Sequence, residues 1–119
     1  MRPKTIFLDI DGTLLKHQGG LSQIAAMPPV LLDGVHEKLD EWDKAGYRII
    51  LITGRKEAMR EITENQLRQT GIYHYERLIM GVGNGSRYLI NDTNAEGGET
   101  AFGITVERNK GIRDVKFLV

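Results

Sequence analysis

The decapeptide TIFLDIDGTL, residues 5–14, joins an apolar run to two aspartates and a glycine. Its continuous apolar start is typical of a buried strand in a parallel sheet, and we expect that strand over Thr5–Ile10. Ligands bind outside the carboxyl ends of such strands, so Asp9 and Asp11 should face a crevice. Gly12 tolerates the bend that follows. At about 4 Å and an effective dielectric near 20, two carboxylates repel by roughly 4 kcal/mol, a cost that a divalent cation reverses. The sequence therefore predicts a site for phosphate chemistry at this strand end.

Two other interpretations of this motif need weighing. Asp, Gly and Thr are ordinary turn residues, so a plain surface turn is one alternative. A calcium loop is the other, because it also begins D-x-D. An EF-hand loop that starts at Asp9 needs Gly at position 14 and Glu at position 20, where the chain has Leu14 and Gly20. The spacing excludes the calcium loop and leaves the turn open.

The composition is that of a small, neutral chain. Its 119 residues predict one domain, 1–119, which buries roughly two-thirds of its unfolded surface. Sixteen basic and sixteen acidic residues cancel, so no global field attracts nucleic acid or an anionic membrane, although a local basic groove stays open. No apolar stretch approaches the ~20 residues of a membrane span, and the start has no signal-peptide pattern. The absence of cysteine fits a reducing compartment. We expect a cytoplasmic protein without nucleic acid or membrane as a partner.

Alternating apolar runs and helical patterns predict an α/β fold. After the first strand we expect four further strands, over Tyr47–Thr53, Glu76–Met80, Arg87–Asn91 and Ala101–Val106. We also expect two helices. The first is capped by Asp33 and runs to about Ala45, and the second covers Arg55–Thr70. This order favours a mostly parallel central sheet in a three-layer, Rossmann-like sandwich without a cap domain. The connection after Met80 is too short for a crossover helix, so either it is irregular or one strand pair is antiparallel.

Two segments lack a clear period. Residues Leu15–Val30 contain two glycines and two prolines, which indicates a loop or hairpin flap over the strand end. Residues Ile112–Val119 could form a short strand or an ordered tail.

Three motifs follow one another along the chain. The hexapeptide DIDGTL, residues 9–14, is followed by a hydrophobic strand ending in Thr53-Gly54-Arg55 and, more loosely, by an acidic strand end at Asn91-Asp92. Together they resemble, in kind and order, the motifs of the haloacid dehalogenase superfamily of aspartate-nucleophile phosphotransferases. The resemblance implies a magnesium-dependent phosphatase that works through an aspartyl-phosphate. It extends to the small capless members, including phosphatases encoded with capsule and surface-polysaccharide genes.

Hydrolysis of a phosphate monoester needs a nucleophile, an acid for the leaving oxygen and positive charge near the anion. By the resemblance, Asp9 is the nucleophile. Asp11 is the general acid and base, with a turn cap as the alternative. The same resemblance assigns Mg²⁺ to Asp9, to Asp11 through its backbone carbonyl, and to Asp92, with Asn91 orienting Asp92 or reaching the metal through water. A polar pair such as Asn91-Asp92 could also be an ordinary turn.

Positive charge and amide groups are expected from two places. Thr53, Gly54 and Arg55 can cradle a phosphate at a helix N-terminus, although Thr53 is also a common helix cap and Arg55 could be solvated. The family's lysine has no counterpart before the fourth strand, because no Lys stands between Lys56 and Lys110. Arg87 is the nearest basic candidate for that role, and it could instead point into solvent.

The resemblance favours a phosphorylated sugar or related small metabolite as substrate. Because the flap is short, either the neighbouring subunit of a homo-oligomer closes the site or the site remains open. Two alternatives stay open. One is a non-catalytic phosphate-binding or interaction module of the same fold, which the missing lysine supports. The other is a phosphatase that acts on an accessible macromolecular phosphate, such as a polynucleotide end or a phosphoprotein.

Overall fold

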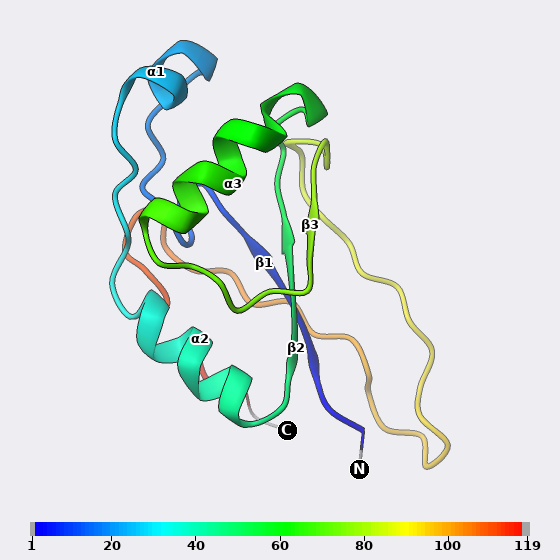
Figure 1. Ribbon diagram of the computed structural model, residues 1–119. Helices are drawn as coiled ribbons and strands as arrows, with labels where there is room; N and C mark the ends of the chain where they lie inside the picture. Colours follow the sequence, from blue (N-terminus) through cyan, green and yellow to red (C-terminus); the bar gives the residue numbers. More distant parts are fainter. Residues whose placement is uncertain (1, 118–119) are drawn as a thin grey trace.

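The computed structural model describes residues 2–117, and within them a three-stranded parallel sheet carries the fold (Figure 1). The strands are β1 (Thr5–Asp9), β2 (Arg48–Ile52) and β3 (Arg77–Ile79), in the order β1-β2-β3. Leu8 lies opposite Leu51 in the first pair, and Leu51 lies opposite Leu78 in the second. The expectation of a Rossmann-like α/β fold with a parallel sheet is confirmed, and each end of the three strands lies within one residue of its predicted position.

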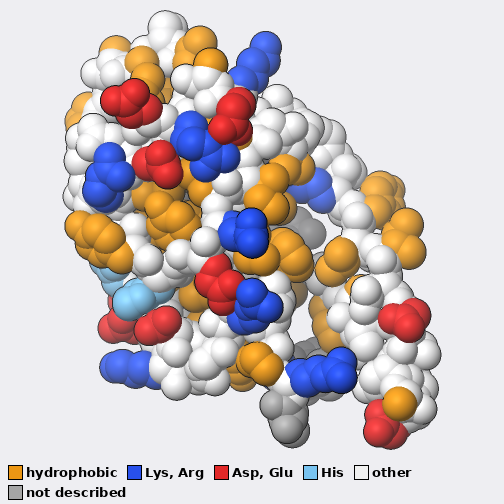
Figure 2. All heavy atoms as spheres, turned by 45° about the vertical axis from the view of Figure 1, so that its right-hand side comes forward, with side chains coloured by type: hydrophobic (Ala, Val, Ile, Leu, Met, Phe, Trp, Pro, Cys, Tyr) orange, Lys and Arg blue, Asp and Glu red, His pale blue; other side chains and the backbone are white. Residues whose placement is uncertain are grey.

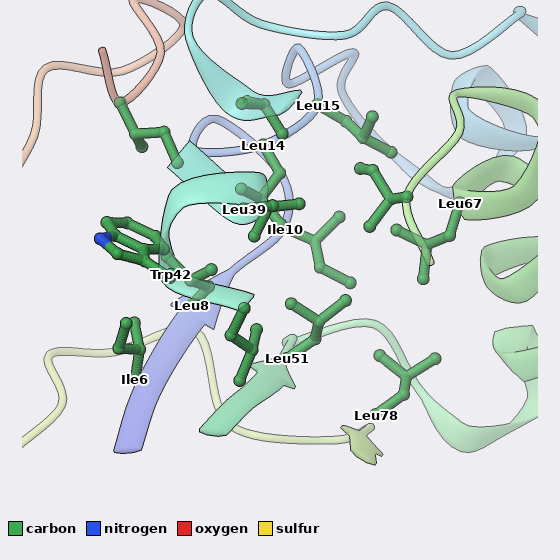
Figure 3. Packing of buried hydrophobic residues seen from close by; sticks show 14 residues of the cluster. Ile6, Leu8, Ile10, Leu14, Leu15, Leu39, Trp42, Leu51, Leu67 and Leu78 are labelled. Atoms are coloured by element: carbon green, nitrogen blue, oxygen red, sulfur yellow. The ribbon is translucent and has the colours of Figure 1, made fainter. Parts of the chain in front are cut away.

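Helices connect consecutive strands. They are α1 (Leu21–Ala26), α2 (Val35–Lys44), a 3₁₀ turn η1 (Glu57–Met59) and α3 (Arg60–Gln69). Along each strand buried and exposed residues alternate, so one face of the sheet packs against α2 and α3. Leu39 and Trp42 of α2 and Leu67 of α3 meet the strand residues in that core (Figure 3). On the opposite face Phe7 and Ile79 stay 47% and 41% exposed.

Local predictions around the helices need correction. The flap contains the short helix α1, which the lack of periodicity concealed. Asp33 does not cap α2, because the N-cap is Gly34 with φ +77° and no side-chain cap forms. The helix expected from Arg55 begins only at Arg60, after the 3₁₀ turn. Thr53 therefore lies well before the helix and is not its cap.

The segment from residue 80 to residue 106, here called the arm, has no helix or strand. The prediction of strands at Arg87–Asn91 and Ala101–Val106 is therefore wrong. A strand needs a neighbouring strand for its backbone, and the arm extends away from the sheet (Figure 1). Tyr88 and Ile90 are 87% and 92% exposed, and hydrophobic side chains are visible along the arm in Figure 2.

After the arm, the chain returns to the body as an ordered tail as far as residue 117. Ile112 is 1% exposed in the core, and the Phe117 ring stacks on Trp42 at 5.4 Å between centroids. No strand forms over residues 112–117, while residues 118 and 119 lie outside the described part. None of the helices over residues 2–117 has the length and apolar character needed to cross a membrane.

Candidate functional site

Asp9 and Asp11 lie where β1 ends and the chain turns sharply. The amides of Leu14 and Leu15 donate to the carbonyl of Ile10 at 2.9 and 3.0 Å. Gly12, with φ +91°, provides the left-handed turn. Because Ile10 and Leu14 are fully buried (0% exposed), they anchor this loop in the core. The side chains of Asp9 and Asp11 stay 34% and 17% exposed, at the carboxyl edge of the sheet.

Arg55 forms a buried ion pair with Asp11. Its Nε and Nη2 donate to the two carboxylate oxygens of Asp11, both at 2.8 Å. Nη1 donates to Thr63 Oγ1 at 3.1 Å and to Gln66 Oε1 at 2.8 Å. Four of the five guanidinium N–H groups are thus engaged, and the side chain is only 4% exposed. Arg55 is neither solvated nor open to an anion here, since a phosphate would have to compete with Asp11 for it.

Gln66 extends this contact to the flap. Its Nε2 donates to the carbonyl of Ile24 in α1 at 2.9 Å, while its Oε1 accepts from Arg55. Between flap and body lies a cavity of about 10 Å³ lined by residues that include Asp11, Arg55 and Gln66, which is room for about one water. The Oε1 atom of Gln18, another lining residue, is buried without a hydrogen-bond partner among residues 2–117. The flap is therefore held to the site through a polar contact.

Thr53 and Gly54 form the second wall of the site. Thr53 is 1% exposed, and its Oγ1 accepts from the Arg55 amide at 3.1 Å. Its amide and carbonyl are both used, the amide donating to Ile79 at 3.0 Å and the carbonyl accepting from Val82 at 2.9 Å. A Cβ at position 54 would displace the exposed Asn84 side chain and would lie 3.1 Å from the carbonyl oxygen of Val82, so the backbone and Asn84 approach closely at this glycine. The three predicted phosphate-binding residues lie together, but in a turn and not at a helix N-terminus.

Arg87 reaches Asp9 from the arm, across 78 residues of sequence. Its Nη1 donates to Asp9 Oδ1 at 3.1 Å, and its Nη2 donates to the carbonyl of Gly83 at 3.2 Å. The two side chains are 33% and 34% exposed. Oδ2 of Asp9 has no hydrogen-bond partner in the described part of the chain. A basic side chain thus contacts the predicted nucleophile, as expected of a residue that takes the role of the family's lysine.

Asp92 lies apart from the two carboxylates. It is exposed on the arm, where its carbonyl accepts from the Thr100 hydroxyl and Asn91 Nδ2 donates to that same hydroxyl at 2.7 Å. Within residues 2–117 no group of three or more Asp, Glu, His or Cys side chains could hold a metal ion. Because the fourth strand does not form, its end is not brought to the edge of the sheet. The structure does not bring the three predicted metal ligands together.

Asp9 keeps one oxygen open to the predicted Mg²⁺. This ion keeps several waters and is bound in many proteins by one or two carboxylates. Asp9 Oδ2 is the oxygen that the arginines leave unused, whereas both oxygens of Asp11 are taken by Arg55. The Asp9 carboxylate would supply one ligand to a hydrated Mg²⁺, and the Asp11 side chain would join only after releasing Arg55.

A turn near the C-terminus completes the site, and sequence reasoning missed it. Asn109 donates its amide to the carbonyl of Gly12 at 2.9 Å, and its Oδ1 accepts from the His17 amide at 2.7 Å. Its φ of +63° is the one positive value at a non-glycine residue in the described chain. The Asn-Lys-Gly sequence was the available signal, since Asn is enriched at positive φ.

Charge pairing holds the same segment to α2. Arg113 binds Asp33 at 2.8 Å and Glu37 at 2.7 Å. The hydrogen bond from Arg113 lowers the pKa of Asp33 below its ordinary value of 3.8. The pKa of Glu37 is also lowered, first by a backbone hydrogen bond and then by Arg113. The amide of Ile112 adds a bond to the carbonyl of Asp33 at 2.9 Å.

No protein-family model matches the chain, and no curated protein matches it. Solved structures do. A chain in the structure of the Pnkp1/Rnl/Hen1 complex is 34% identical over 72% of this chain and 30% of its own, with a TM-score of 0.58. A chain in the structure of the Pnkp1/Rnl/Hen1 RNA repair complex is 32% identical over 71% and 28%, with a TM-score of 0.57. The present chain thus spans less than a third of the length of these two chains, and it is similar to them in both sequence and fold.

Proposed function

We propose that the protein is a phosphomonoesterase in which Asp9 attacks phosphorus. The observation that carries this proposal is the state of the Asp9 carboxylate. It lies at the carboxyl edge of a parallel sheet, is one-third exposed, and has one oxygen held by Arg87 and the other without a partner in the described chain. A carboxylate so placed can form an aspartyl-phosphate. The similarity to haloacid dehalogenase motifs supports the same role.

The reaction has two steps. In the first, an Asp9 oxygen bonds to phosphorus as the ester P–O bond breaks, and the leaving oxygen takes a proton from Asp11. In the second, water attacks phosphorus, returns a proton to Asp11 and releases phosphate from Asp9. Mg²⁺, held by the Asp9 carboxylate and the backbone carbonyl of Asp11, would offset charge on the transferring group.

Asp11 can exchange a proton only after its contact with Arg55 is broken. In the structure both of its oxygens accept hydrogen bonds from the arginine. We infer that an incoming phosphate draws Arg55 away from Asp11, which frees the acid and brings the guanidinium to the anion in one movement. The predicted phosphate-binding role of Arg55 and the predicted acid role of Asp11 are thereby compatible.

The first substrate class we propose is a terminal phosphate on a polynucleotide. The similar chains belong to a complex described as an RNA repair complex, which weighs against the expectation that nucleic acid is no partner. The second class is a phosphorylated sugar, which the resemblance to capless phosphatases favours. In that case a second copy covering the exposed apolar side chains of the arm would close the site. A cytoplasmic location stays a prediction.

The test is phosphate release from a panel, with Mg²⁺ and with EDTA. The panel holds oligonucleotides phosphorylated at either end, nucleoside monophosphates, sugar phosphates and phosphopeptides. Asp9→Asn removes the nucleophile while keeping the side chain's size, so it should abolish release by a folded protein. Trp42, the single tryptophan, is 2% exposed and reports that fold by fluorescence.

The assay can reject either the role of Asp9 or the phosphatase activity as a whole. Turnover by Asp9→Asn within about tenfold of the parent, a barrier change of only about 1.4 kcal/mol, would remove Asp9 from the role of nucleophile. If the parent releases phosphate from no member of the panel, the non-catalytic binding module becomes the better description.

A further inference from the structure

The turn at residues 107–111 is clamped to the loop that carries the two aspartates. Asn109 binds both sides of that loop, at the carbonyl of Gly12 and the amide of His17. At the far end of the turn, Gly111 has φ +85° and lies against the backbone of Asp33, where a Cβ would overlap it. Backbone contacts therefore hold the turn at both ends, and they fix the position of its side chains relative to Asp11 and Asp9.

Arg108 is the side chain that this clamp brings to the site. Its Cγ would lie 3.3 Å from a Cβ built on Gly12, so its aliphatic stem crosses the glycine next to Asp11. Arg108 is exposed and forms no ion pair with any residue from 2 to 117. It differs in this respect from Arg55 and Arg87, each of which is neutralised by an aspartate.

Lys16 adds a second unpaired cation beside the loop that carries Asp11. It is exposed, it forms no ion pair within the described residues, and it lines the small cavity beside Asp11 and Arg55. Its neighbour His17 is the residue whose amide Asn109 holds. Lys16 and Arg108 are thus two unpaired cations next to the loop that carries Asp11, on a chain whose net charge is zero.

We propose that Arg108 and Lys16 form a subsite for a second phosphate of the substrate, the phosphodiester next to the terminal phosphate. The proposal rests on the proposed phosphatase function and refines its substrate class to a polynucleotide end. Unpaired cations beside a site attract the phosphate backbone without reading sequence. A monosaccharide monophosphate has no second phosphate to occupy such a subsite.

The test compares a terminally phosphorylated trinucleotide with the nucleoside monophosphate that carries the same phosphate. Arg108→Ala should lower kcat/KM for the trinucleotide about tenfold or more and change the value for the monophosphate less than twofold. Arg108→Lys should restore part of the loss. The salt dependence of trinucleotide binding should weaken by about one phosphate contact. Arg77→Ala is the matched control, because this exposed arginine starts β3 at the opposite edge of the sheet, and it should leave both substrates unchanged.

Two kinetic results would overturn the subsite. One is an equal loss on both substrates, which would give Arg108 a general role in the reaction. The other is no loss on either. Anisotropy of a labelled trinucleotide in EDTA gives a second readout that needs no turnover, and equal affinity in parent and Arg108→Ala would also reject the subsite. A parent that binds the trinucleotide through Arg108 yet releases no phosphate would contradict the phosphatase function and leave the subsite standing.

Discussion

Replacing Asp11 by alanine should destabilise the fold by about 2–4 kcal/mol, whereas Asp9→Ala should change the free energy of unfolding by no more than about 1 kcal/mol. The two residues are chemically identical and two positions apart, and each pairs with one arginine. The difference is burial. The side chains of Arg55 and Asp11 are 4% and 17% exposed, while those of Arg87 and Asp9 are 33% and 34% exposed.

The magnitude follows from what each deletion leaves behind. Without Asp11, the buried Arg55 guanidinium keeps only the neutral acceptors Thr63 and Gln66. Removing one partner of a buried pair costs about 3–5 kcal/mol, and we reduce this because two acceptors remain and Asp11 is partly solvated. Without Asp9, Arg87 turns into water, which offsets most of the loss for an exposed pair worth about 0–1 kcal/mol.

The assay is equilibrium unfolding in urea, with EDTA present, followed through the fluorescence of Trp42. For a urea m-value of about 1–3 kcal/mol per M, a loss of 3 kcal/mol lowers the midpoint by about 1–3 M. The double variant Asp11→Ala with Arg55→Met is the control. It removes the orphaned charge along with the acid, so it should be more stable than Asp11→Ala alone. Equal losses for Asp9→Ala and Asp11→Ala would refute the argument from burial.

Three further outcomes are expected. Mg²⁺ at about one hundred times its Kd should stabilise the parent by roughly 2.7 kcal/mol and so raise its melting temperature. Asp92→Ala should show the same rise; a variant that no longer responds to Mg²⁺ would show that the arm brings Asp92 to the metal. Arg87→Ala should lower kcat by about a hundredfold, or roughly 2.7 kcal/mol, with a smaller effect on KM and partial recovery in Arg87→Lys; unaltered kinetics would assign Arg87 to solvent. Arg113→Ala should destabilise the fold at neutral pH but not at about pH 2. The lowered pKa of Asp33 gives stability that is present above its ordinary 3.8 and is lost as pH falls through the folded value; a pH-independent difference in melting temperature would contradict this.

Elements that depend on local pattern could be predicted from the sequence. The apolar runs at β1 and β2 placed both strands, and the period of Val35, Leu39 and Trp42 placed α2, whose buried residues are those three. In each case the pattern that forms the element also buries it against the core. Asp9 and Asp11 were placed at a strand end for the same reason.

Features that depend on distant partners could not be predicted. The apolar residues at Tyr88 and Ile90 have the composition of a strand, but no neighbouring strand lies beside them and they stay exposed. Asp33 has the residue type of a helix cap, yet it binds Arg113, 80 residues away. Nothing near Arg55 in the sequence indicates that Asp11, 44 residues earlier, takes its hydrogen bonds. Residue type alone does not select among such partners.

The charges of the site show why a further cation belongs to the proposed chemistry. Asp9 with Arg87 and Asp11 with Arg55 form two pairs that cancel. A phosphate monoester adds a charge of about −1.5 to −2 at neutral pH. At about 4 Å and an effective dielectric near 20, each unopposed pair of like charges costs roughly 4 kcal/mol. The paired arginines cannot offset this without giving up their aspartates. A divalent ion at Asp9 would offset it, and so would the unpaired side chains of Arg108 and Lys16 in the proposed subsite. If the subsite exists, longer substrates should therefore depend less on Mg²⁺ for binding than the monophosphate does, while turnover of both should still require it.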